Sequence, residues 1–151
     1  MSKSTVLKFM ESAKVIFYAD MRYNPQKKSF DFFLSNQIEL DKTHGIYFIL
    51  DGDDILKIGK ADGVNGLRGR VKSYQANLQS RKNDHTVDLI YTIMMGPLKG
   101  KGLKMYIYPL PPKEVEHHGY ILESQMTRSL ERVLSKQAKE ECHSMLLSGQ
   151  N

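Results

Sequence analysis

The chain has 151 residues, a net charge of +5 and 40% hydrophobic side chains, which is typical of one globular domain and excludes a disordered chain. The excess of basic side chains favours a polyanionic partner, most simply nucleic acid. The single cysteine, Cys142, excludes an intrachain disulfide. We also find no signal-peptide pattern and no membrane-spanning apolar run. We therefore expect a cytoplasmic protein, or a nuclear one if the source has a nucleus, without a membrane partner.

The first predicted element is a helix over residues 4–21, where apolar side chains recur at about every 3.6 positions. A polar break that contains a proline follows at residues 22–29. The short apolar segment at residues 30–40 is ambiguous between a strand and a helix. We assign residues 1–41 to an N-terminal helical extension.

Residues 44–61 predict a β-hairpin, because two short apolar runs flank the turn DGD. With a three-residue loop, Tyr47 opposes Lys57 and Gly45 opposes Gly59 across the antiparallel pair. The phenol and the ammonium then lie side by side on one face of the hairpin. The ammonium would lower the pKa of the phenol and make Tyr47 a usable base. The alternative is a plain hairpin with an amphipathic tyrosine and a lysine whose charged end reaches solvent.

The remaining predicted elements are a helix at 65–82, strands at 86–95 and 105–110 around a basic loop at 96–104, and a helix at 119–141. The order along the chain is therefore helix, strand, strand, helix, strand, strand, helix. This order predicts an α+β fold in which helices flank a small central antiparallel sheet.

Two of these helices carry candidate functional side chains. Arg70 and Tyr74 are four residues apart and share one helix face, and the planar guanidinium of an arginine suits phosphate oxygens. On the last helix, Glu123 lies at the border of the apolar stripe, whereas Glu131 points away from it. A carboxylate at such a border needs a cation, and its hard oxygens suit magnesium. The alternatives are a solvated surface arginine and a glutamate stabilised by the helix dipole.

Four motifs resemble the GIY-YIG nuclease superfamily in order and spacing: GIY at Gly45–Tyr47, KIG at Lys57–Gly59, LRGRVKSY at Leu67–Tyr74, and YILES around Glu123. The resemblance covers residues 43–135 and implies a GIY-YIG-like nuclease domain over residues 42–151. Lys57 replaces the second motif tyrosine, as in a restriction-enzyme-like branch of the superfamily. A downstream asparagine found in some members has no clear match.

The resemblance implies an endonuclease, of a restriction type in that branch, that hydrolyses DNA phosphodiester bonds with a magnesium or manganese ion. Its catalytic set maps onto Tyr47, Lys57, Arg70, Tyr74 and Glu123. Tyr47 is then the general base or orients the attacking water, and Arg70 stabilises the phosphate in the transition state. Tyr74 helps to position water or phosphate. The metal ligand is Glu123, with Glu131 as the alternative.

DNA binding is expected to depend on phosphate contacts from basic side chains, for which the candidates are Lys60, Arg68, Lys99, Lys101 and Lys104, and further Arg81 and Lys82. The alternative is that the basic loop is merely solvated. A homodimer with two identical sites would explain double-strand cuts. Two other functions stay open: a non-catalytic nucleic-acid-binding module on the same scaffold, and an interaction protein that binds its partner through the N-terminal extension.

Overall fold

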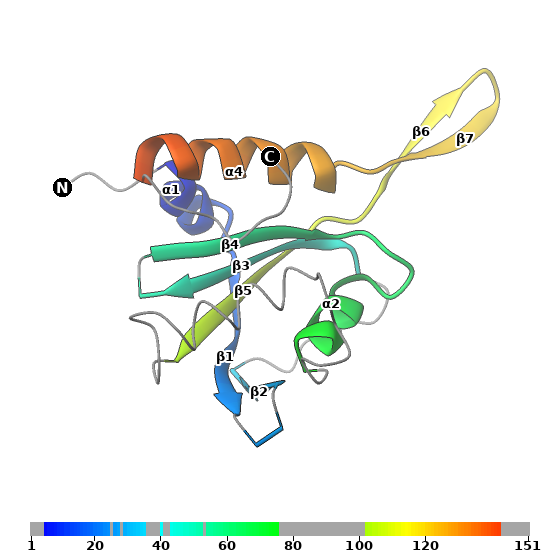
Figure 1. Cartoon of the computed structure of the whole chain (residues 1–151). Helices are drawn as coiled ribbons and strands as arrows, with labels where there is room; N and C mark the ends of the chain where they lie inside the picture. The colour runs from blue at the N-terminus through cyan, green and yellow to red at the C-terminus, as the bar shows by residue number, and fades with distance from the viewer. Residues whose placement is uncertain are drawn as a thin grey trace.

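The computed structural model describes residues 5–24, 26–27, 29–35, 40, 43–52, 54–75 and 102–142. Its centre is a five-stranded antiparallel sheet with the strand order β2-β1-β5-β3-β4, and a separate two-stranded hairpin extends from one side (Figure 1). The predicted α+β class, with helices flanking a central antiparallel sheet, is confirmed. Within the described ranges, no helix has the length and apolar character that crossing a bilayer requires.

The described elements are, in chain order, α1 (Thr5–Ser12), β1 (Ile16–Asn24), β2 (Ser29–Leu34), β3 (Gly45–Asp51), β4 (Asp54–Ala61), α2 (Gly66–Gln75), β5 (Leu103–Pro109), β6 (Lys113–His117), β7 (Tyr120–Ser124) and α4 (Thr127–Cys142). One face of the sheet is covered by α1 and α4, where Ile46, Phe48 and Ile58 form a buried cluster with Leu134. The other face is covered by α2, whose Tyr74 joins a second cluster with Tyr47. Each face therefore has its own hydrophobic core.

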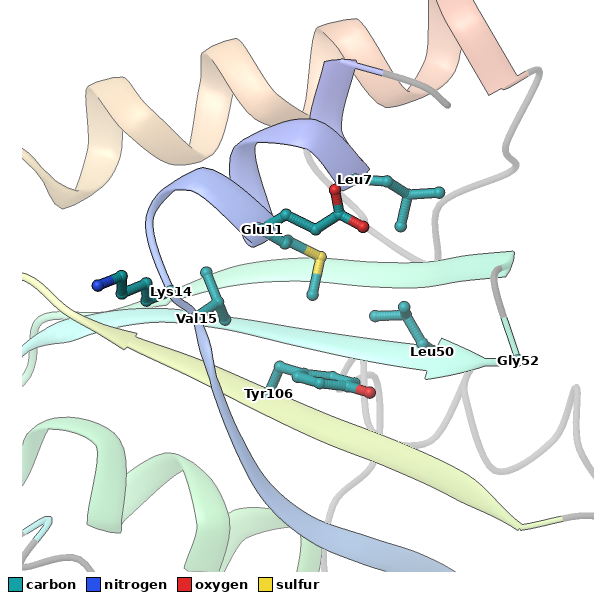
Figure 2. A pocket seen from close by; sticks show the side chains of 8 residues that line it. Leu7, Glu11, Lys14, Val15, Leu50, Gly52 and Tyr106 are labelled. Carbon is teal, nitrogen blue, oxygen red and sulfur yellow. The ribbon is translucent and has the colours of Figure 1, made fainter. Parts of the chain in front are cut away.

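A cavity of about 330 Å³ lies between α1 and the sheet, on the face that α4 covers (Figure 2). It is lined by Leu7, Met10, Glu11, Lys14, Val15, Leu50, Gly52 and Tyr106. Lys14 ends the helix in the left-handed region with a φ of 53°, and the chain then enters β1. This cavity is separated by the sheet from the face that carries Tyr47.

The predicted helix over residues 4–21 is wrong beyond Ser12, because the following residues form β1. The segment from Val15 to Tyr18 is β-branched and aromatic, and pairing with β5 favours the strand that such side chains prefer. The ambiguous segment that follows begins with a strand, since β2 covers Ser29–Leu34. The first 41 residues thus supply two strands to the central sheet, and the division at residue 41 stays a prediction.

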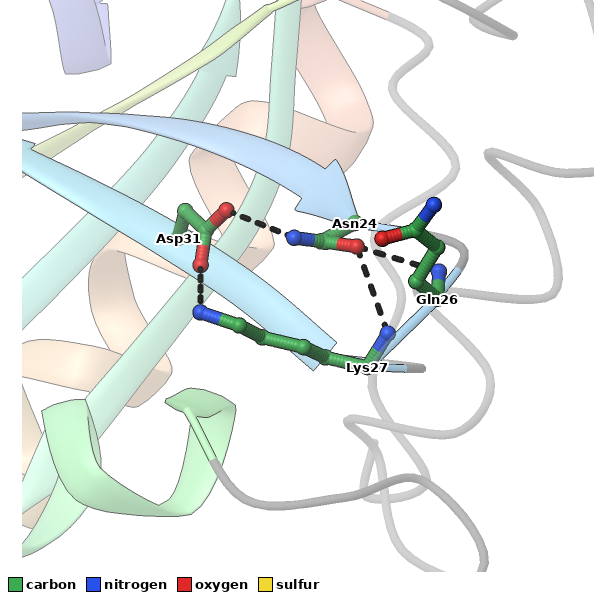
Figure 3. A network of polar contacts seen from close by, with 4 residues as sticks. All are labelled: Asn24, Gln26, Lys27 and Asp31. Carbon is green, nitrogen blue, oxygen red and sulfur yellow. Dashed lines mark hydrogen bonds and ion pairs between the residues drawn. The ribbon is translucent and has the colours of Figure 1, made fainter.

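The turn between β1 and β2 is organised by the side chain of Asn24 (Figure 3). Its Oδ1 accepts hydrogen bonds from the backbone amides of Gln26 and Lys27 at 3.0 and 3.2 Å, and its Nδ2 donates to Asp31 at 3.1 Å. Asparagine commonly makes such turns, because its short amide competes well for nearby backbone groups. The polar break that the sequence predicts is therefore a specific turn of a β-hairpin.

The predicted helix over residues 119–141 is wrong in its first turns, because residues 113–124 form the β6–β7 hairpin and α4 begins at Thr127. His118 and Gly119 have φ values of 50° and 84°, which suit a tight two-residue hairpin turn. Glu123 consequently lies on an exposed strand rather than at the border of a helical core stripe.

The hairpin of β3 and β4 is confirmed, but its register differs from the predicted one. Asp51 pairs with Asp54, so the loop is one residue shorter than predicted, and the register shifts again between Ile49 and Leu50. As a result, Tyr47 opposes Gly59, and Lys57 opposes Ile49. The two shifts add up to two residues, which keeps Tyr47 and Lys57 on the same face of the sheet.

Candidate functional site

Two buried tyrosines from different elements form the centre of the candidate site. Tyr47 on β3 and Tyr74 on α2 are only 2% and 1% exposed. Their hydroxyl oxygens are 3.3 Å apart, and their rings meet edge to face with centroids 6.0 Å apart. The structure therefore brings together two side chains that lie 27 residues apart and that the sequence assigns to one site.

The two motif glycines that flank this centre are explained by close packing. The ring of Tyr47 lies across Gly59, where a Cβ atom would collide with the phenol end of the ring. At Gly45 a Cβ atom would collide with the backbone carbonyl of Tyr108 and approach Leu67 on α2 to 3.1 Å. Glycine at both positions thus lets the tyrosine and the helix approach the sheet closely.

The start of α2 is fixed to the chain just before β3. The amide of Leu67 donates to the carbonyl of Thr43 at 2.7 Å, and Gly66 has a φ of 55°. A Cβ atom on Gly66 would collide with the Thr43 backbone, so glycine is required there for space as well as for conformation. These backbone contacts set the position of α2, and of Arg70 on it, relative to Tyr47.

Arg70 lies over the centre and borders a polar cavity. Its guanidinium carbon is 5.7 Å from the centroid of the Tyr47 ring, within range of a cation–π contact. The cavity, about 380 Å³, is lined by Ala61, Asp62, Gly63, Val64, Asn65, Gly66, Gly69, Arg70 and Ser73. It lies at the N-terminal end of α2, where the helix dipole and the guanidinium both favour an anion.

Lys57 is 4% exposed and lies on the edge strand β4, on the same face as Tyr47. The predicted direct opposition of Lys57 and Tyr47 is wrong, since Tyr47 opposes Gly59 and Lys57 opposes Ile49, two pairs further along the ladder. An effect of the ammonium on the pKa of Tyr47 stays a prediction.

The end of β4 carries a second polar group that connects the sheet to α4. Lys60 donates to both carboxylate oxygens of Asp62, at 3.0 and 3.1 Å, and the hydroxyl of Thr127 donates to the same carboxylate at 3.4 Å. Burial alone would raise the pKa of Asp62, but the hydrogen bond and the positive charge of Lys60, together with the hydrogen bond from Thr127 and a backbone hydrogen bond, outweigh it and lower that pKa. Sequence reasoning missed Asp62, although its place between Lys60 and a glycine-containing loop was a usable signal.

Glu131, on α4, faces this group and is half-buried. Burial raises the pKa of Glu131, while the positive charges of Lys60, Lys57 and Arg132 act in the opposite direction. The carboxylate therefore lies within electrostatic reach of both lysines on β4. Of the two candidate glutamates, Glu131 is therefore the one that the structure brings close to the β3–β4 hairpin.

The other predicted site residues lie elsewhere. Glu123 lies on β7, exposed and paired opposite Glu114, on the hairpin that extends away from the sheet (Figure 1). Arg68 lines a separate small cavity beside Tyr18. Burial raises the pKa of Tyr18, and the positive charge of Arg68 offsets only part of this rise. Lys104 is exposed on β5 with its ammonium 5.1 Å from the centroid of Phe17. The remaining basic candidates, Lys99, Lys101, Arg81 and Lys82, lie outside the described residues.

No family model matches the chain, and no curated protein matches its sequence. The fold does match solved structures, among them two endonucleases. A mutant of EndoII from bacteriophage T4 has a TM-score of 0.62 at 16% identity, over 87% of this chain and 92% of that one. The restriction endonuclease HPY188I in complex with product DNA has a TM-score of 0.55 at 17% identity, over 96% of this chain and 84% of that one. The chain has the fold of these two endonucleases. A coverage of 96% also extends the likeness into the first 41 residues, which the motif resemblance left out.

Proposed function

We propose that the chain is a metal-dependent endonuclease that hydrolyses DNA phosphodiester bonds. The observation that carries the proposal is the packing of Arg70, Tyr47 and Tyr74 beside a polar cavity that favours an anion. The fold shared with two endonucleases, one of them in complex with DNA, supports the same reading. The net charge of +5 is suited to a phosphate backbone.

In this proposal Arg70 binds the scissile phosphate in the cavity at the start of α2. Its planar guanidinium can donate two hydrogen bonds to phosphate oxygens and neutralise the charge that develops in the transition state. The same guanidinium lies 5.7 Å from the centroid of the Tyr47 ring, so the proposed phosphate site is adjacent to the phenol.

Tyr47 accepts the proton of the attacking water in this mechanism, or orients that water. Tyr74 orients the Tyr47 hydroxyl through a hydrogen bond, since the two oxygens are 3.3 Å apart. Lys57 shares the face with Tyr47 and favours the ionised phenol electrostatically. The burial of Tyr47 keeps competing solvent away from the hydroxyl.

We place the metal on Glu131 rather than on Glu123. The half-buried carboxylate of Glu131 has a pKa raised by burial, so a divalent cation beside it would offset the cost of its charge. Among the described residues no group of three His, Cys, Asp or Glu side chains could hold a metal by itself. This agrees with magnesium, which keeps several waters and uses one or two carboxylates together with substrate oxygens. When bound, Mg²⁺ or Mn²⁺ supplies Lewis-acid stabilisation of the phosphate and of the leaving oxygen.

The test is cleavage of supercoiled plasmid with magnesium, compared with EDTA and with Glu131→Ala and Glu123→Ala. We expect metal-dependent nicking or linearisation that Glu131→Ala abolishes, and the comparison decides between the two glutamates. Discrete fragments would support a restriction-type role. Salt-sensitive DNA binding without cleavage under any metal would instead replace the proposal with a non-catalytic binding module.

A further inference from the structure

The β6–β7 hairpin, residues 113–124, is an arm whose side chains are all exposed, in both strands and in the turn. It includes large apolar side chains, of which Tyr120 and Ile121 are each 72% exposed. An isolated two-stranded hairpin is at best marginally stable in water, and an apolar patch of this kind marks an interaction site. The arm extends beyond the start of α4 and away from the sheet (Figure 1).

The strand register divides the arm into an apolar face and an acidic face. Val115 opposes Leu122 and His117 opposes Tyr120, so these four side chains share one face. Glu114 directly opposes Glu123, and Glu116 opposes Ile121 on the other face. Directly opposed like charges destabilise a strand pair, unless a basic partner compensates for them. The acidic face, which also carries the exposed Ile121, therefore suits a partner surface that is basic and has an exposed apolar side chain.

The outer surface of α4 has this combination. Arg128, Arg132 and Lys136 are exposed and four residues apart, so they form one basic stripe along the helix. Val133, beside this stripe, is a large apolar side chain that is also exposed, as is Met126 just before the helix. This surface is complementary in charge and in apolar character to the arm.

The charge balance favours a second copy of the chain over DNA as the partner. The arm contains one lysine and three glutamates, whereas the rest of the chain contains 21 basic and 14 acidic side chains, a net charge of +7. Phosphates would be repelled by the glutamate face of the arm, but the basic body of another copy would attract it.

We propose that the arm of each copy docks on α4 of a second copy, with its acidic face against the basic stripe and with Ile121, which lies on that face, against Val133. In this proposal the exchange is reciprocal: the arm of each copy binds α4 of the other, which gives a dimer with two-fold symmetry. Glu123 then belongs to the dimer interface. The proposal does not depend on the nuclease function.

The decisive experiment is reciprocal charge reversal, followed by molar mass from light scattering at micromolar concentration. One chain carries Glu114→Lys with Glu116→Lys in the arm, and the other carries Arg128→Glu with Lys136→Glu in α4. Arg132 is left unchanged because its charge acts on Glu131. We expect the unmodified chain to be a dimer and each variant alone to be a monomer. Mixing the two variants should restore a dimer, since both arm–helix contacts then join opposite charges.

Two further variants test the apolar contact. Ile121→Ser should also give monomers, whereas Val64→Ser, at a side chain that is 86% exposed outside the arm, should leave the dimer intact. Circular dichroism must show that every variant is folded. A monomeric unmodified chain, or folded variants that stay monomeric when mixed, would overturn the proposal. If the arm variants instead change only the affinity for DNA, the arm binds DNA and the proposal is also overturned.

Discussion

The ring of Tyr47 lies across Gly59 on the neighbouring strand, so the tyrosine of the first motif can occupy its place only because the second motif ends in glycine. We therefore expect Gly59→Ala to displace the phenol and to lower stability by about 1–3 kcal/mol, the usual cost of overpacking. Denaturant unfolding and plasmid cleavage would measure both effects. Gly102→Ala is the matched control, since a Cβ atom there meets nothing within 4 Å. Equal activity of Gly59→Ala and the unmodified chain would contradict the role given to this contact.

Tyr47→Phe should abolish most cleavage while leaving DNA binding unchanged. The substitution keeps the packed ring and removes only the hydroxyl, which the proposal uses for proton transfer, so we expect a loss of about 10²-fold or more. Stability should fall by only about 1 kcal/mol through the lost contact with Tyr74. Tyr74→Phe removes the same contact but keeps the Tyr47 hydroxyl, and should therefore be less damaging to the rate. Turnover retained by Tyr47→Phe would remove the base assignment.

Arg70→Lys should lower the rate of cleavage by about 10²–10³-fold, although the charge is kept. A lysine is a point charge without the planar fork that binds two phosphate oxygens, and it would cover the Tyr47 ring less well. Arg68→Lys, on the same helix but beside a different cavity, is the matched control and should have a much smaller effect. Single-turnover kinetics at saturating enzyme would separate the chemical step from binding. Equal losses from both substitutions would indicate general charge effects instead.

The register of the hairpin shows how far sequence reasoning reached at this site. The pattern predicted a hairpin with Tyr47 and Lys57 on one face, and both features are correct. The pattern could not predict the loop length, because Gly52 takes a φ of 61° and closes a turn that is one residue shorter. Nor could it predict the irregularity in the strand pairing between Ile49 and Leu50. A shift of one residue would have reversed the face of Lys57, and the second shift restores it.

The last helix shows where sequence reasoning failed. Residues 119–126 have apolar spacing that fits a helix, yet Tyr120, Ile121 and Leu122 also favour a strand, and the turn at His118 and Gly119 decides for the strand. Periodicity alone cannot separate these states over so short a segment. The predicted helix placed Glu123 at the border of a core stripe, whereas the electrostatic contact of Glu131 with two lysines appears only in three dimensions. Which glutamate binds the metal stays a prediction.

Glu131→Gln should make the protein more stable at neutral pH and inactive. The pKa of Glu131 is raised above its ordinary value of 4.5, chiefly by burial, so the folded state holds this proton more tightly than the unfolded state. The free energy of unfolding therefore falls as the pH rises from the ordinary value through the raised one. The glutamine variant has no carboxyl to ionise, so its free energy of unfolding does not fall in this way as the pH rises. Melting temperatures of both proteins in EDTA, from acidic to neutral pH, should diverge as the pH rises. Magnesium should reduce the difference in melting temperature, because it stabilises only the unmodified protein. A difference that magnesium leaves unchanged would contradict the metal assignment.

Asp62→Asn should have the opposite pH dependence. The pKa of Asp62 is lowered below its ordinary value of 3.8, because the hydrogen bond and the positive charge of Lys60, together with the hydrogen bond from Thr127 and a backbone hydrogen bond, outweigh its burial. The carboxylate therefore contributes stability that is fully present above the ordinary value and is lost as the pH falls through the lowered one. Since Lys60 and Asp62 are partly exposed, we expect the variant to be less stable at neutral pH by no more than about 1 kcal/mol. Urea unfolding of both proteins should give free energies that converge in acid. A difference that persists at the lowest pH would show that Asp62 acts through packing, and the contact between β4 and α4 would then not depend on its charge.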